Sequence, residues 1–288
     1  MPRGIANSHM HATKNLRLPL PQLAEIPFCA GDAELRVLSD ETLFATCGTR
    51  IAFTTRAGGV SEGPYAGLNL SYSVDDDAGR VDANRRLLCA ALDAVNCIES
   101  LISPLQVHGS DFIKIRQVVE SQRETAGEAD GIVCMQSEIP VLLCFADCVP
   151  VILVAPDGSF AVIHSGWRGS IAGIAGKGLR KLQLAARCAA SDINCYIGPH
   201  IGPCCYEVSA ELVGQFVAEF GESCDAGNNH LDLSAAVIAS LTRAGAAEDR
   251  IADAGVCTSC HHDAYYSYRA DAGVTGRHGA FAIRKEES

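Results

Sequence analysis

Short apolar runs separated by glycine, proline and small polar residues recur along the chain and predict a series of β-strands. The longest such stretch, ADCVPVILVAPDGSFAVIHSGWRG, spans residues 146–169 and consists of two apolar runs joined by a turn at 156–159. Further strands are expected at 51–55, 129–135, 139–148 and 193–198, two short ones within 101–117, and irregular or edge elements at 16–28 and 35–38.

Apolar residues spaced three and four apart predict helices between these strands. The expected helices and their N-caps are 83–95 with Asp82, 170–190 with Ser170, 210–220 with Ser209, and 235–244 with Ser234. Strands and helices are mixed without strict βαβ alternation, and neither a repeat nor a linker interrupts them. The pattern therefore favours a single α+β domain over residues 11–288.

Composition and charge narrow the class of protein. The 288 residues are 48% hydrophobic, and no apolar stretch approaches the ~18 residues that a membrane span needs. A net charge of −11 argues against a nucleic-acid-binding surface, which requires a basic face. An anionic substrate would need a pocket that gathers arginines locally.

The chain contains 14 cysteines but no apolar signal segment near its start. The opening MPRGIANSHM (residues 1–10) is expected to be a tag or cloning remnant. Several cysteines lie within apolar runs, where a free thiol packs as a small hydrophobe. We therefore expect a reducing, cytoplasmic location and no disulfide framework.

The ends of the 146–169 hairpin carry the candidate chemistry. A turn at 156–159 places Val151 opposite His164, so Cys148 lies three residues, or about 10 Å, beyond that pair unless the chain bends at Pro150. His108 is expected in a tight turn at a strand end. His108, Cys148 and His164 would suit a catalytic zinc with an open position. The alternatives are a buried core pair, or Cys148 as a nucleophile with His164 as its base.

Other candidates carry weaker signals. The string after His164 places Arg168 beside glycines that precede a helix, an arrangement that can bind an anion, and Asp147 adds a carboxylate. Arg56, in a glycine-rich loop, either reaches an anion or is a solvated turn residue. The CTSC string at 257–260 is a structural or incidental half-site, or a second metal site. Adjacent Cys204 and Cys205 are expected to pack in the core rather than to chelate together.

Several strings together are specific, and the sequence resembles the YfiH/laccase-domain family, also called the multicopper polyphenol oxidoreductase or purine nucleoside phosphorylase family. The resemblance covers about residues 51–283. Two positions depart from the usual pattern, Ser165 in place of alanine and Ala270 in place of a second arginine, which leaves Arg269. The strings are, in order, FTTRAGGVSEGPYAGLNL, QVHGS, ADGIV, ADCVPVIL, HSGWRG, IGPHIGPCCYEV and SYRADAGVTGR.

The resemblance implies a single-domain, four-layer α/β/β/α sandwich and a metal held by His108, Cys148 and His164. Zinc is the expected ion, and copper is the alternative. The implied reaction is phosphorolysis of adenosine, inosine, guanosine and S-methyl-5'-thioadenosine, with adenosine deaminase as a side activity. The candidate catalytic residues are Cys148, His164, His108 and Asp147, and the candidate substrate- or phosphate-binding residues are Arg56, Asn69, Arg168 and Arg269.

Two rival enzymatic functions and one non-enzymatic function remain. The first is a hydrolase in which Cys148 attacks an amide, for instance in a cell-wall precursor. The second is a copper-dependent polyphenol oxidase, which the sequence disfavours because a multicopper centre needs many histidines in H-x-H pairs. The chain has nine histidines, and its one such pair, His9 and His11, lies at the expected tag remnant. A non-catalytic metal-binding or regulatory protein is the alternative from another class.

Overall fold

Two β-sheets form the centre of the computed structural model, which describes residues 17–31, 33–116 and 127–286. The segment expected to be a tag remnant, 1–10, lies outside the described residues. One sheet has the order β1-β2-β3-β11-β6 and the other β10-β9-β7-β8-β5-β4. The strands are β1 Ala24–Ala30, β2 Ala33–Ser39, β3 Thr49–Thr54, β4 Phe112–Ile115, β5 Gly131–Cys134, β6 Val141–Phe145, β7 Val149–Val154, β8 Phe160–Ser165, β9 Asn194–Ile197, β10 Ile251–Asp253 and β11 His278–Arg284.

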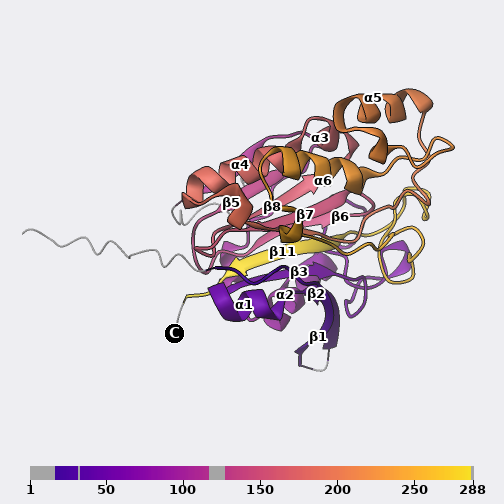
Figure 1. The fold of residues 1–288 in the computed structure, drawn as a ribbon. Helices are drawn as coiled ribbons and strands as arrows, with labels where there is room; N and C mark the ends of the chain where they lie inside the picture. The colour runs from indigo at the N-terminus through magenta and orange to yellow at the C-terminus, as the bar shows by residue number, and fades with distance from the viewer. Residues whose placement is uncertain (1–16, 32, 117–126, 287–288) are drawn as a thin grey trace, which may run out of the picture.

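Helices cover the outer faces of both sheets (Figure 1). Helices α3 to α6 lie over the six-stranded sheet, and α1 and α2 lie on the side of the five-stranded sheet. This arrangement is the four-layer α/β/β/α sandwich that the resemblance implied. The helices are α1 Glu41–Cys47, α2 Ala78–Ala91, α3 Trp167–Ile171, α4 Ile174–Ala186, α5 Ala210–Phe220 and α6 Leu233–Arg243.

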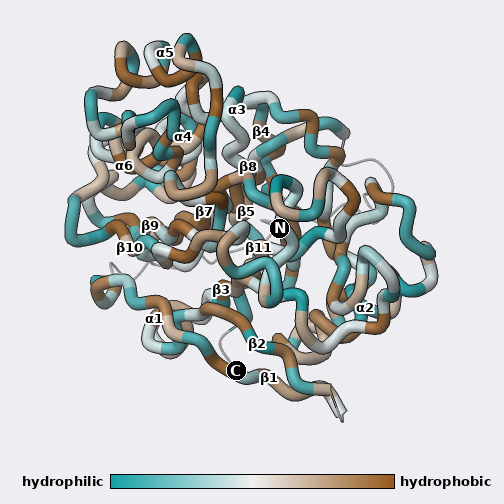
Figure 2. The backbone as a smooth tube through the Cα atoms, turned by 90° about the vertical axis from the view of Figure 1, so that its right-hand side faces the viewer, coloured by the Kyte–Doolittle hydropathy of each residue, from teal (hydrophilic) through white to brown (hydrophobic). Residues whose placement is uncertain are grey.

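Three hydrophobic clusters fill the spaces between the four layers. One lies between the six-stranded sheet and its helices, one between the two sheets, and one between the five-stranded sheet and α2. Both faces of the central strands are therefore buried, which explains why β7 is a continuous apolar run rather than an alternating one. Figure 2 shows the hydrophobic segments gathered at these central strands.

The hairpin of β7 and β8 forms as predicted, but its register differs by one residue. Pro150 pairs with His164, and Val151 pairs with Ile163. The connection is longer than expected, because Ala155 and Ser159 close a loop in which Gly158 takes a positive φ of 78°. Such a loop combines a tight turn with a bulge. Cys148 therefore lies two residues, rather than three, before the β7 residue that pairs with His164.

Three predicted helix starts are wrong, and one is confirmed. Ser209 caps α5 as expected, whereas Asp77 caps α2 in place of Asp82, and Asp232 caps α6 in place of Ser234. Each of the two aspartates precedes the predicted cap by a few residues and accepts a hydrogen bond from a backbone N–H of the first turn. The predicted helix from Ser170 is two helices, and Gly166 precedes the first of them.

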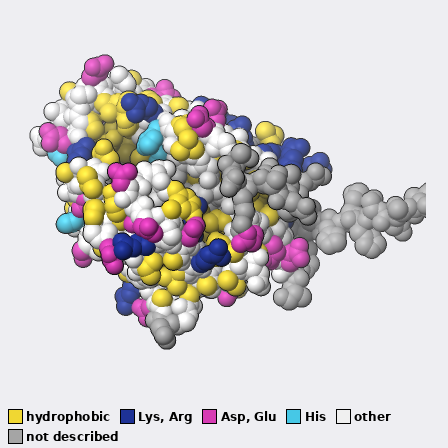
Figure 3. Space-filling view, turned by 180° about the vertical axis from the view of Figure 1, so that it is seen from behind, with side chains coloured by type: hydrophobic (Ala, Val, Ile, Leu, Met, Phe, Trp, Pro, Cys, Tyr) yellow, Lys and Arg dark blue, Asp and Glu magenta, His cyan; other side chains and the backbone are white. Residues whose placement is uncertain are grey.

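No helix within the described ranges is long and apolar enough to cross a membrane. Figure 3 shows one face of the molecule, on which acidic side chains are scattered among basic and hydrophobic ones. Such a mixture differs from the basic surface that nucleic-acid binding requires.

The inter-sheet core makes a stability prediction at Phe53 of β3. Its ring is fully buried and packs so tightly against the backbone at Gly198, after β9, that a Cβ there would lie 2.3 Å from Phe53 Cδ1. We expect Phe53→Ala to lower the free energy of unfolding by about 3–5 kcal/mol, measured by urea denaturation. Leu184→Ala is the control, because Leu184 is 77% exposed. Equal losses in both variants would contradict the assignment of this core.

Candidate active site

His108, Cys148 and His164 come together at the end of the β7–β8 hairpin. Their ligand atoms all lie within 4.8 Å of one another, and the two imidazole rings meet edge-on with centroids 4.8 Å apart. His164 is in β8, Cys148 directly precedes β7, and His108 lies in the loop before β4. The predicted bend at Pro150 does not occur, because Pro150 lies within β7 and pairs with His164; the chain turns instead at Asp147, just before Cys148, where φ is 83°. His108 itself also has a positive φ, of 59°.

Asp130 holds this arrangement together from behind. Its fully buried carboxylate accepts a 2.7 Å hydrogen bond from Nδ1 of His164 and bonds of 3.0 and 2.6 Å from the backbone N–H groups of His108 and Gly109. The N–H of Val107 adds a fourth contact, at 3.2 Å. With Nδ1 bound to Asp130, Nε2 of His164 remains for a metal or a proton. Asp130 was not among the predicted site residues, although it stands in the ADGIV string.

The electrostatics of the cluster favour a charged pair in the metal-free protein. Burial by itself raises the pKa of Cys148, but the charge of His164 and hydrogen bonds from both histidines lower it from an ordinary 9.0 to about 6. Burial opposes protonation of His164, yet the Cys148 thiolate and Asp130 raise its pKa to about 9. Both shifts favour a thiolate and an imidazolium over the neutral pair at neutral pH.

The donor set fits a single borderline-soft metal ion. One sulfur and two imidazole nitrogens match the three protein ligands of a catalytic zinc. The cavity beside them leaves room for a fourth, non-protein ligand. Gly166 permits this close approach, since a Cβ there would lie 3.2 Å from Cys148 Sγ and 3.0 Å from His108 Cδ2. Metal binding would displace the proton that His164 carries in the metal-free pair.

A cavity of about 760 Å³ opens above the cluster, and its charge is opposite to that of the whole chain. Four arginines line it, and each guanidinium lies 4.3 to 5.9 Å from the ring of an aromatic residue that also lines it. Asp147 is the single carboxylate among the lining residues. The four pairs are Arg85 with Tyr72, Arg168 with Trp167, Arg269 with Tyr206, and Arg277 with Tyr268.

Most of the predicted site residues line this cavity, but Arg56 and Asn69 are not among its lining residues. The guanidinium of Arg56 donates to the carbonyls of Ala66 and His262 and ties two loops together. Asn69 is fully buried, and its side-chain oxygen accepts from the backbone N–H of Arg277, so it supports the wall from behind. Arg85 and Arg277 take part in the lining without having been predicted. The last arginine of the SYRADAGVTGR string was the available signal for Arg277.

Asp147 is held firmly at the edge of the cavity. One carboxylate oxygen accepts from the hydroxyl of Thr258 and the other from the backbone N–H of Arg269, both at 2.7 Å. The side chain of Arg269 is also engaged, because it donates to the carbonyls of Cys205 and Glu207. Asp147 therefore links the His108–Cys148–His164 cluster to two loops of the cavity wall.

The predicted anion site at a helix start near Ser170 does not form. Ser170 lies inside the five-residue helix α3, and its buried hydroxyl bonds to that of Ser165 at 2.8 Å. Arg168, by contrast, is exposed to the cavity. No hydrogen bond or ion pair to another described residue occupies its guanidinium. Its free donors make Arg168 the anion-binding candidate that needs no rearrangement.

Comparison with known proteins agrees with these motifs. A family profile described as multi-copper polyphenol oxidoreductase laccase matches residues 50–285. The chain belongs to this family. It is 37% identical over 256 residues to a purine nucleoside phosphorylase named YlmD from Geobacillus stearothermophilus, covering 83% of this chain and 92% of that protein.

One further relative and one solved structure support the membership of this laccase-domain chain. A purine nucleoside phosphorylase of Deinococcus radiodurans is 38% identical over 232 residues, covering 78% of this chain and 85% of its own. The crystal structure of YlmD from Geobacillus stearothermophilus superposes with a TM-score of 0.78 at 34% identity, covering 91% of this chain and 100% of that one. The two-sheet fold is therefore shared by a solved relative.

The contacts of Asp130 predict its effect on metal binding. Asp130→Asn keeps the shape of the side chain but removes the charge that orients His164, so we expect a zinc affinity about 10–100-fold lower. Competition with a chromophoric chelator measures this loss. Asp111→Asn is the matched control, because the Asp111 side chain is exposed nearby. Unchanged affinity in Asp130→Asn would refute the orienting role.

The charged pair predicts how Cys148 reacts in metal-free protein. Because the folded pKa is lowered to about 6, the thiolate persists as the pH falls and is lost only through about pH 6. We expect alkylation by iodoacetamide, followed by peptide mass spectrometry, to reach half its plateau rate near that pH. Cys188 is the internal control, because burial raises its pKa to about 11. A Cys148 midpoint near 9 would disprove the pair.

Proposed function

We propose that this chain is a metal-dependent purine nucleoside phosphorylase acting on adenosine, inosine, guanosine and S-methyl-5'-thioadenosine. The supporting observation is the His108–Cys148–His164 cluster at the floor of a cavity lined by four arginine–aromatic pairs. The arginines suit an anionic co-substrate, and the aromatic rings suit a flat purine. The relatives named purine nucleoside phosphorylase support the same reaction.

The phosphate is assigned to Arg168. Its guanidinium carries donors that no other described residue uses, and bidentate contacts to phosphate oxygens are the interaction that this group makes best. Arg85 and Arg277 add positive charge to the same wall, although each already donates to backbone carbonyls. The net charge of −11 makes such a local concentration necessary for attracting phosphate.

The reaction exchanges one bond at the sugar. A phosphate oxygen forms a bond to C1′ while the C1′–N9 bond breaks, and the purine leaves with the bonding electrons and takes up a proton. The products are the free base and ribose 1-phosphate, or the methylthio sugar phosphate from the thioether substrate. We assign the proton transfer to Asp147, the carboxylate that lines the cavity. The aromatic rings of Tyr72 and Tyr268 are assigned to stacking with the base.

His108, Cys148 and His164 would hold a zinc ion, with copper as the alternative. A bound zinc would supply Lewis acidity and lower the pKa of a water for the proposed adenosine deaminase side activity. In that reaction the oxygen of the water becomes bonded to C6 of the purine, and the 6-amino group leaves as ammonia. Asp130 would keep His164 oriented through its 2.7 Å bond to Nδ1. These residues would hold the metal at the floor of the cavity, whereas Arg168 would bind phosphate at the cavity wall.

A cysteine hydrolase is the second candidate, and one observation favours it. Cys148, His164 and Asp130 lie in the order of a nucleophile, a base and an orienting carboxylate, and the lowered pKa of Cys148 suits attack on an amide. The copper oxidase has less support. Among the described residues, two groups of side chains could hold a metal, and only one of them contains histidine.

Phosphate dependence separates these functions. Purified protein of known metal content is incubated with adenosine or inosine, with and without inorganic phosphate, and chromatography follows the free base, ribose 1-phosphate and inosine. We expect base release that requires phosphate and falls to background in Cys148→Ala. Arg168→Ala should raise the KM for phosphate about tenfold or more, because it removes a charged hydrogen bond worth about 1.5–3 kcal/mol.

Arg180→Ala is the matched control, because Arg180 is exposed on α4, outside the cavity lining. Base release without phosphate, or activity that survives in Cys148→Ala, would overturn the proposed phosphorolysis. Covalent trapping of substrate on Cys148 in metal-free protein would favour the hydrolase instead.

A further inference from the structure

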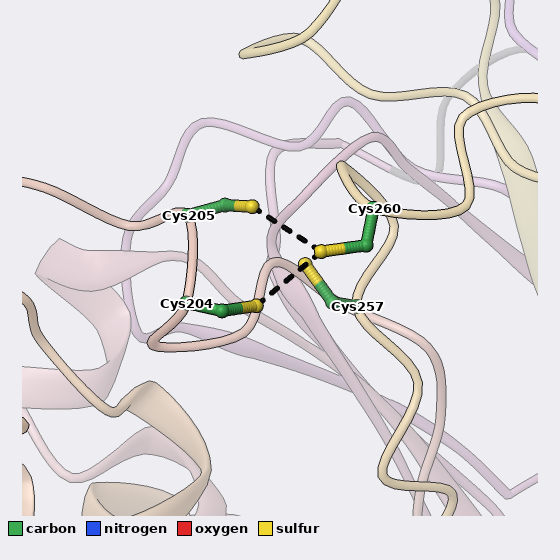
Figure 4. Close-up of side chains that lie close together, drawn as sticks. All are labelled: Cys204, Cys205, Cys257 and Cys260. Carbon is green, nitrogen blue, oxygen red and sulfur yellow. Dashed lines mark hydrogen bonds between the residues drawn. The ribbon is translucent and has the colours of Figure 1, made fainter.

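Four cysteines outside the candidate active site converge at one edge of the six-stranded sheet (Figure 4). Cys204 and Cys205 lie in the loop after β9, and Cys257 and Cys260 lie in the loop after β10. Because β9 and β10 pair in parallel, both strands end at the same edge. A bridge between His200 and Cys257 continues the pairing into the loops. The topology thus brings together two cysteine pairs that are more than fifty residues apart.

The sulfur positions suit one tetrahedral ion. All four Sγ atoms lie within 4.8 Å of one another, and Cys260 Sγ is 3.5 Å from Cys204 Sγ and 3.4 Å from Cys205 Sγ. A tetrahedral zinc with Zn–S bonds of about 2.3 Å places its sulfurs about 3.8 Å apart. An iron–sulfur cluster also takes four thiolates, but it encloses several ions and holds the sulfurs farther apart.

Adjacent cysteines were not expected to bind one ion together, but the loop after β9 places the Cys204 and Cys205 side chains on the same side. The backbone N–H groups of Cys205 and Tyr206 both donate to the carbonyl of Gly202, which closes a tight turn. Figure 4 shows the Cys204 and Cys205 side chains pointing the same way, towards Cys257 and Cys260. Cys205 packs against the core beneath the helices as predicted, whereas Cys204 is exposed, and the CTSC string is not isolated because Cys257 and Cys260 lie beside these two cysteines.

Two further features distinguish this cluster from ordinary core cysteines. Cys204 and Cys260 are exposed, so apolar packing does not account for their placement. The backbone N–H of Gly202 donates to Cys257 Sγ at 3.2 Å, an interaction that stabilises a thiolate. Gly202 also permits the close approach, since a Cβ there would lie 3.2 Å from Cys257 Cβ and 3.4 Å from Cys204 Sγ.

We propose that Cys204, Cys205, Cys257 and Cys260 form a structural zinc site separate from the His108–Cys148–His164 cluster. Four thiolates close the coordination sphere and leave no position for a substrate, as in other structural zinc sites. Thiolate ligands also select zinc over hard cations such as magnesium and calcium.

The site has a direct consequence for the cavity. The two loops that it joins carry Tyr206, which lines the cavity, and Thr258, which hydrogen-bonds to Asp147. The guanidinium of Arg269 donates to the carbonyl of Cys205. A zinc ion bound by the four cysteines would therefore fix the wall of the cavity beside Cys148 without touching a substrate.

Metal stoichiometry in a Cys148→Ser background tests the proposal, because this change removes a ligand of the other cluster. Full-length protein is loaded with zinc under a non-thiol reductant, desalted and analysed for metal. We expect one tightly bound zinc per chain in Cys148→Ser and none when Cys260→Ser is added. Cys29→Ser is the matched control, since Cys29 is an exposed thiol on β1 and should leave the zinc in place.

Thiol protection provides a second measurement that needs no change in the cluster. In Cys148→Ser, zinc should shield Cys204, Cys205, Cys257 and Cys260 from alkylation, and a strong chelator should expose all four. Equal labelling with and without zinc, zinc retained in Cys148→Ser/Cys260→Ser, a disulfide among the four, or iron in place of zinc would each overturn the proposal. Neither measurement reads nucleoside turnover, so failure of the proposed phosphorolysis would leave the result unaffected.

Discussion

The buried carboxylate of Asp130 is the interaction on which the candidate site depends. It accepts hydrogen bonds from Nδ1 of His164 in β8 and from backbone N–H groups of the loop that carries His108. A fully buried charge is tolerated only when hydrogen bonds and an opposite charge compensate its desolvation. The same contacts that keep Asp130 ionised therefore orient the His164 side chain and hold the loop that carries His108, and the lowered pKa of Asp130 reflects this.

The cavity shows how an acidic protein can offer a site for an anion. Each of its four arginines lies near an aromatic ring, which covers one face of the guanidinium and leaves the N–H edge for hydrogen bonds. Three of the four also donate to backbone carbonyls, which holds them in place at the cost of donors for a ligand. Arg168 differs because its guanidinium donates to no other described residue and lies over the ring of Trp167, its immediate neighbour in the chain.

Much of the fold follows from local patterns that tertiary contacts did not change. The strands β3, β5, β6, β7, β8 and β9 lie where the apolar runs predicted them, because strands buried on both faces are apolar throughout. Helix starts were less predictable, since Asp77 and Asp232 compete with nearby Asp82 and Ser234 for the same role. The hairpin register shifted because a positive φ at Gly158 allows a longer loop than the predicted turn.

The sequence by itself determined the residue types of the site, since ordered motifs marked His108, Cys148 and His164, and the histidines form too few H-x-H pairs for a multicopper centre. Only the tertiary structure decided which residues meet. Asp130 acts on His164 across the pairing of β5 with β8, and Cys204 and Cys205 meet Cys257 and Cys260 because β9 and β10 run in parallel. Spacing along the sequence does not predict such contacts, because strand order and register set the distance between these side chains.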